Sequence, residues 1–120
     1  MLTEKEKGAE GSKKQLESID ILGLEYAITY VDNPADADLY KRSSVWGQID
    51  YWTRTIRIYQ KNRGERDVFE TLLHEILHGI VDRLKLKSLA KEENHDELDL
   101  LAIGITDILY ANNLLVCNVE

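Results

Sequence analysis

The spacing of the hydrophobic residues changes near the middle of the chain. Before residue 60 they occur in short runs rich in β-branched and aromatic residues, which are typical of strands. Residues 19–22 and 25–31 form two such runs separated by Gly23, which predicts two short strands or one strand with a bulge. Residues 45–50 and 53–59 alternate between apolar and polar, and the short gap between them predicts a hairpin. We therefore expect a small, mostly antiparallel sheet of about three strands.

From residue 65 onward the apolar residues recur every three to four positions, which predicts two amphipathic helices. The first begins near residues 65–67, where acidic side chains favour a helix N-terminus, and ends near residues 84–86. The second covers about residues 92–111 and stops at two asparagines. Its expected buried stripe consists of Leu98, Leu101, Ala102, Ile105, Ile108 and Leu109. The predicted fold class is α+β, with the small sheet packed on two main helices.

Length and composition indicate one domain of ordinary globular type. The 120 residues, 43% of them hydrophobic, suffice for one modest core. Residues 1–14 are polar, charged and glycine-bearing, so we expect a flexible leader before a single domain at residues 15–120. No signal peptide and no stretch of transmembrane length is present, so we expect a cytoplasmic protein without a membrane partner.

Charge and cysteine content exclude further classes. The formal net charge of -7 argues against nucleic acid as the main partner. The single cysteine, Cys117, cannot form an intrachain disulfide or a cysteine-based zinc site. A metal site in this chain must therefore use histidines and carboxylates.

Two histidines lie four positions apart on the predicted first helix. His74, Glu75 and His78 form the pattern H-E-x-x-H, and residues four apart share one side of a helix. Two imidazoles placed this way can bind one metal ion, and the glutamate can accept a proton from a water on that metal. The alternative is a solvated helix face with two unrelated histidines. Gly79 follows directly, and because glycine weakens a helix we expect another element to approach closely there.

A hydrolytic zinc site needs three protein ligands and one open position, and the candidates for the third ligand stand at the start of the second helix. At about 100° per residue, Glu97 lies nearest one edge of the expected apolar stripe, His95 flanks the opposite edge and Asp99 points further toward solvent. We expect Glu97 to be the third ligand, with His95 and then Asp99 as alternatives. Asp82 follows His78 by one turn and is either a surface carboxylate or an acceptor for an imidazole N–H.

Three aromatic residues, Trp46, Tyr51 and Trp52, lie near the turns of the predicted sheet. We expect them to pack in the core and turns, with a substrate platform as the alternative. Tyr51, Tyr59 and Tyr110 are also candidates for stabilising a developing oxyanion.

The order and spacing of these residues resemble a family of enzymes. His74-Glu75-x-x-His78 followed by Glu97 is similar to the gluzincin arrangement of zinc-dependent peptidases. Residues 97–102, Glu-Leu-Asp-Leu-Leu-Ala, resemble the second-helix motif of the small ImmA/IrrE-like metallopeptidases of phages and mobile elements. The resemblance covers about residues 22–113, and Leu98 stands where the family usually has a small residue.

This resemblance implies a zinc metallopeptidase. Zn²⁺ would be held by His74, His78 and Glu97, and Glu75 would be the general base that activates water against a peptide bond of a protein substrate, such as a regulatory protein. The strand at residues 53–59 would bind the substrate backbone by strand addition. The alternative is a catalytically silent metal-binding or regulatory protein on the same scaffold.

Overall fold

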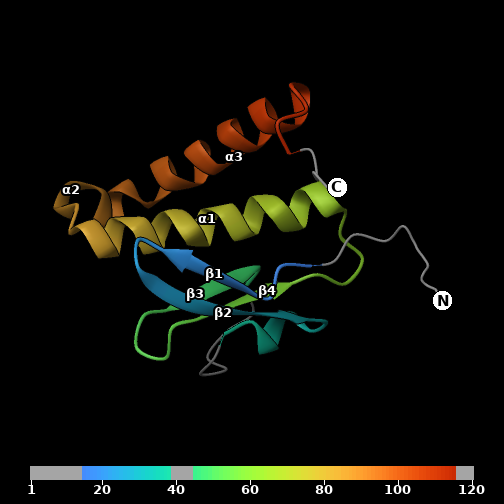
Figure 1. The fold of residues 1–120 in the computed structure, drawn as a ribbon, viewed down its shortest axis with the longest axis horizontal. Helices are drawn as coiled ribbons and strands as arrows, with labels where there is room; N and C mark the ends of the chain where they lie inside the picture. Colours follow the sequence, from blue (N-terminus) through green and yellow to red (C-terminus); the bar gives the residue numbers. More distant parts are fainter. Residues whose placement is uncertain (1–14, 39–44, 116–120) are drawn as a thin grey trace.

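A four-stranded sheet forms the base of the structure, and two helices are layered above it (Figure 1). The computed structural model describes residues 15–38 and 45–115, so the expected leader at 1–14 lies outside the described residues. The strands follow the spatial order β1-β2-β4-β3. Their bounds are β1 (Ser18–Ile21), β2 (Leu24–Val31), β3 (Gly47–Asp50) and β4 (Thr55–Tyr59).

The sheet consists of two hairpins joined side by side. β1 pairs with β2 and β3 pairs with β4, both antiparallel, whereas β2 and β4 in the middle are parallel. The expectation of about three, mostly antiparallel strands is corrected to four strands in a mixed sheet. The alternation of apolar residues indicates which face of a strand is buried, but it does not specify which strands become neighbours. Because β4 lies between β2 and β3, the expected substrate edge at residues 53–59 is also wrong, and β1 and β3 are the outer strands of the described sheet.

The turn between β1 and β2 depends on two residues with positive φ. Leu22 has φ 52° and Gly23 has φ 95°, and the Gly23 N–H donates to Asp20 Oδ1 at 2.7 Å. The interruption expected at Gly23 is thus a tight hairpin turn, not a bulge within one strand.

The long helix α1 (Glu65–Leu84) crosses one face of the sheet, and α3 (His95–Ala111) packs on the opposite side of α1 (Figure 1). The predicted bounds of the first helix are confirmed. The connection contains the short helix α2 (Lys87–Ala90) and the 3-10 turn η2 (Glu92–Asn94), and another 3-10 turn, η1 (Pro34–Asp36), follows β2. The core between α1 and the sheet consists of Ile21, Tyr26, Ile28, Ile56, Ile58 and Leu72. Among the described helices, none has both the length and the apolar character needed to cross a membrane.

Gly79 lies where α1 approaches two strands most closely. A Cβ atom at this position would stand 2.8 Å from Ile21 Cδ1 and 3.1 Å from Ile49 Cδ1. The expected close approach at Gly79 is confirmed, and it is made by isoleucine side chains of β1 and β3. The missing side chain sets how near the following turns of α1 lie to the sheet.

The buried face of α3 differs from the expected stripe. Leu98, Ala102 and Thr106 are buried, whereas Leu101 and Ile108 are exposed. Leu98 and Ala102 belong to both faces, but the burial of Thr106 and the exposure of Leu101 and Ile108 place the observed centre about 60° from the expected one. This rotation of α3 about its axis decides which of its polar residues reach α1.

The three aromatic residues near the turns do not pack in the core. Trp46 is 62% exposed, Tyr51 41% and Trp52 90%. The expectation of core packing is therefore wrong. Trp46 and Tyr51 still make contacts at the two ends of β3, to Tyr59 and to the His78 carbonyl respectively, whereas Trp52 is almost fully exposed.

Candidate metal centre

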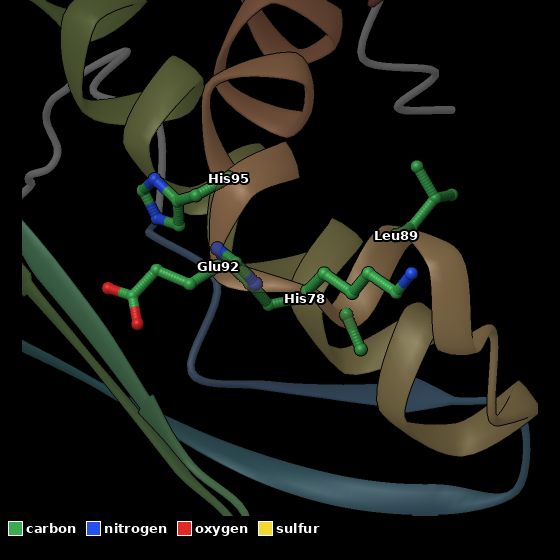
Figure 2. A pocket seen from close by; sticks show the side chains of 6 residues that line it. His78, Leu89, Glu92 and His95 are labelled. Atoms are coloured by element: carbon green, nitrogen blue, oxygen red, sulfur yellow. The ribbon is translucent and has the colours of Figure 1, made fainter.

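Three histidines from two helices converge at one point. His74 and His78 come from α1 and His95 is the first residue of α3. Each offers one ring nitrogen, and these three atoms lie within 4.8 Å of one another. The Nε2 atoms of His74 and His78 are 3.0 Å apart. Figure 2 shows His78 and His95 reaching the same space from their separate helices.

The rotation of α3 explains why His95 joins the pair. If the buried residues Leu98, Ala102 and Thr106 mark the inner face, its centre lies at Ala102. At about 100° per residue, His95 stands only about 20° from that centre, whereas Glu97 stands about 140° away. The packing that buries Leu98 and Ala102 against α1 therefore also directs His95 toward α1.

The other carboxylates proposed from the sequence occupy different places. Glu97 is exposed and is not among the three converging residues. Asp99 Oδ1 lies 3.3 Å from His74 Nδ1, on the side of the ring away from His78. Asp82 acts at a distance on two tyrosines, where its charge helps to raise the pKa of Tyr26 and Tyr51. The carboxylate beside an imidazole is thus Asp99, not Asp82.

Burial keeps His74 and His78 in the form that binds metals. It lowers the pKa of His78 to about 4, helped by the neighbouring His74 and His95. Burial also lowers the pKa of His74, although Asp99 opposes this. Neutral imidazoles present a lone pair to a cation. Two ligands on a tetrahedral zinc with Zn–N bonds of about 2.0–2.1 Å would stand about 3.3 Å apart, close to the observed His74–His78 spacing. The donor set therefore fits Zn²⁺.

Glu75 lies on the inner side of the same helical turn and is 8% exposed. Its carboxylate accepts a hydrogen bond from the backbone N–H of Ile49. Tyr59 N–H donates to Trp46 O at 2.8 Å, so alternate pairs of the β3–β4 ladder are bonded and Ile49 points its N–H away from β4. Burial raises the pKa of Glu75 to about 7, which the Ile49 N–H partly offsets. A carboxyl group with this pKa can accept and release a proton near neutral pH.

The β3–β4 turn contacts the same part of α1. Tyr51 Oη donates to the carbonyl oxygen of His78 at 3.2 Å. Burial raises the pKa of Tyr51 to about 12, and the charges of Asp82 and Glu75 add to the effect. Tyr51 is therefore a neutral donor that attaches the turn to the helix backbone beneath the histidines. Tyr51, one of the three tyrosines considered from the sequence, thus contacts this turn of α1.

A cavity of about 250 Å³ opens beside the histidines (Figure 2). It lies between the histidine cluster and the connection of α1 to α3. Its lining consists of His78, Leu89, Ala90, Lys91, Glu92 and His95. This wall was not predictable from the sequence, because residues 85–94 are mostly polar and lack a clear hydrophobic period.

Comparison of the chain with protein-family models, curated proteins and solved structures finds no match.

Proposed function

We propose that this protein is a zinc-dependent hydrolase that cleaves peptide bonds of a protein substrate. The observation that carries the proposal is the convergence of His74, His78 and His95 beside the buried carboxylate of Glu75. The resemblance of the first helix to the zinc peptidases supports the same chemistry. The third ligand in this proposal is His95, which replaces Glu97 of the gluzincin arrangement.

Different residues would have different roles in such a reaction. When bound, Zn²⁺ would supply a Lewis acid that makes water a nucleophile near neutral pH. Glu75 accepts the proton of the attacking water at its carboxylate and then delivers it to the nitrogen of the leaving amine. The Ile49 N–H holds this carboxylate in place through the reaction. Asp99 orients the His74 ring, because a carboxylate at Nδ1 favours the tautomer whose Nε2 is free to bind metal.

The free edge of β3 supports an extended peptide as the substrate. β3 is an outer strand of the sheet, and Ile49 in its middle contacts Glu75. A peptide added to this edge would therefore run past the general base. The cavity at Leu89 and Glu92 would receive a substrate side chain next to the scissile bond.

The alternative is a metal-binding or regulatory protein without turnover. A purely structural zinc site is closed by four protein ligands, whereas only three histidines converge among the described residues. A buried glutamate whose pKa is near 7 adds nothing to metal retention, and its position favours catalysis.

Metal content and the Glu75→Gln variant test the proposal together. Wild-type protein purified without added zinc should contain about one equivalent, or regain it on reconstitution, because such sites bind zinc tightly. Glu75→Gln should retain zinc and the fold but lose hydrolysis of a denatured protein such as casein. Equal hydrolysis by the variant would remove Glu75 from the mechanism. Absence of zinc after reconstitution would show that the three histidines do not form a zinc site. The contact between the rings of His74 and His78 would then be only a hydrogen bond.

A further inference from the structure

The exposed aromatic side chains of the described residues all lie at the ends of β3. They are Trp46, which precedes the strand, and Tyr51 and Trp52, which follow it. The other described aromatic residues are buried or half-buried. Tryptophan and tyrosine are enriched at the centres of binding interfaces, so their restriction to one strand marks that strand as a binding surface.

The Trp46 indole is held in place by two neighbouring side chains. The Arg63 guanidinium lies 4.4 Å from the centre of the Trp46 ring, and the Tyr59 ring lies 5.8 Å from it. Arg63 is itself fixed by hydrogen bonds to Tyr59 O at 2.7 Å and to Thr71 Oγ1 at 2.7 Å. Trp46 therefore presents a rigid apolar surface at the start of β3.

Trp52 stands on a turn that is closed by side chains. Asp50 Oδ2 accepts hydrogen bonds from Thr53 Oγ1 at 2.6 Å and from Thr53 N–H at 3.3 Å. Tyr51 attaches the same turn to the carbonyl of His78. The backbone that carries Trp52 is thus fixed, while its indole is 90% exposed. An aromatic side chain has only two χ angles and loses little conformational entropy when it binds a partner.

The strand between the two tryptophans runs beside the candidate metal centre. Ile49 in β3 donates its outward N–H to Glu75, and Tyr51 directly after β3 contacts the helical turn of His78. A ligand along this edge is therefore in reach of both tryptophans and of the histidine cluster.

We propose that Trp46 and Trp52 are substrate-binding residues that select an extended peptide segment with apolar side chains near its two ends. The two tryptophans flank the four residues of β3, so a peptide of about seven residues would cover the strand and extend past both of its ends. That the bound segment is also a substrate rests on the function proposed above. The selectivity itself depends only on the two indoles and the edge of β3.

Tryptophan fluorescence tests the binding directly. The protein has two tryptophans, so Trp46→Phe and Trp52→Phe each leave one reporter. In zinc-loaded protein that also carries Glu75→Gln, a blocked heptapeptide with Phe at both ends and Gly, Ser and Thr between should shift the emission of each reporter. A matched peptide with Asn at both ends should bind about tenfold more weakly. If the peptide shifts the emission of neither tryptophan, or if the two peptides bind with equal affinity, the proposal is overturned.

Turnover provides a second measurement with a matched control. For a heptapeptide with a central fluorogenic bond, Trp52→Ala should raise KM about tenfold while kcat stays within about twofold and zinc content is unchanged. Leu100→Ala removes another exposed apolar side chain, one that lies on α3 and not at β3, and should leave KM unchanged. An unchanged KM in both Trp46→Ala and Trp52→Ala would exclude the tryptophans from substrate binding.

The two proposals fail in different ways. Peptide binding with reporter shifts but no hydrolysis in the wild type would overturn the peptidase and leave the binding surface standing. Hydrolysis by the wild type whose KM is unchanged in both Trp46→Ala and Trp52→Ala would overturn the binding surface and leave the peptidase standing.

Discussion

The imidazole rings of His78 on α1 and His95 on α3 are stacked, with 5.1 Å between their centroids and 27° between their planes. This contact joins the two helices at the candidate metal centre, and it places His95 where a third ligand is required. His95 and Glu97, two residues further along α3, are both exposed, but only His95 is among the three converging residues.

The first prediction concerns this third ligand. His95→Ala should weaken zinc binding by more than about 100-fold, beyond the loss typical of an outer partner. Glu97→Ala should change the affinity by less than about twofold, because an exposed carboxylate away from the cluster contributes little. Competition with a chromogenic chelator measures both constants. The opposite order of effects would return the third-ligand role to Glu97.

A second prediction follows from the 3.3 Å contact of His74 Nδ1 with Asp99 Oδ1. Asp99→Asn should weaken zinc binding by about 10–100-fold, as expected when the partner that orients a metal-binding imidazole is replaced. Asp82→Asn is the matched control, since Asp82 lies on α1 without contact to an imidazole nitrogen and should leave the zinc affinity unchanged. If both variants lose similar zinc affinity, the loss would come from removing a negative charge near the site and not from a change in the orientation of the His74 ring.

Two helical glycines give opposite predictions for stability. Gly79→Ala should destabilise the protein by about 1–3 kcal/mol, because the added Cβ would overlap Ile21 and Ile49. Gly104 on α3 has nothing within 4 Å of an added Cβ, so Gly104→Ala should stabilise the protein by up to about 1 kcal/mol through helix propensity. Urea unfolding of both variants at equal slope measures the difference. A stabilised Gly79→Ala variant would contradict the packing of α1 on β1 and β3.

The buried carboxyl group of Glu75 predicts a pH dependence in the metal-free protein. Burial raises the Glu75 pKa from its usual value of 4.5 to about 7, so the folded state retains a proton that the unfolded state releases. Its contribution to stability is complete below pH 4.5 and is lost as the pH rises to about 7. The total loss is about 3 kcal/mol.

The Glu75→Gln variant isolates this effect. Glutamine does not titrate, so the variant should gain stability relative to the wild type between about pH 4.5 and pH 7. His78 works in the opposite direction, because its pKa is lowered to about 4 and its contribution is lost as the pH falls below 6.5. Both proteins carry His78, so its contribution cancels in the comparison. A difference that does not change with pH, measured by urea unfolding in the presence of a chelator, would contradict the burial of Glu75.

The individual helices, strands and turns were predictable because each depends on residues that are close together in the sequence. The apolar period and the acidic first turn predicted α1 at the observed bounds, and the alternating runs predicted β3 and β4 as a hairpin. The turn at Gly23 was located correctly because a tight hairpin needs a residue that tolerates positive φ. The pairing of β2 with β4 was not predictable in this way, since no local pattern distinguishes one buried neighbour from another.

The H-E-x-x-H spacing determined by itself that His74 and His78 share one side of a helix, because the helical period fixes which residues are neighbours. It also marked Glu75 as the candidate base. Only the tertiary structure decided what completes the site. The rotation of α3 depends on how Leu98, Ala102 and Thr106 fit against α1, and a shift of one residue in that contact turns the helix by about 100°. That angle separates His95 from its neighbours, so packing between the helices selects His95 to join His74 and His78.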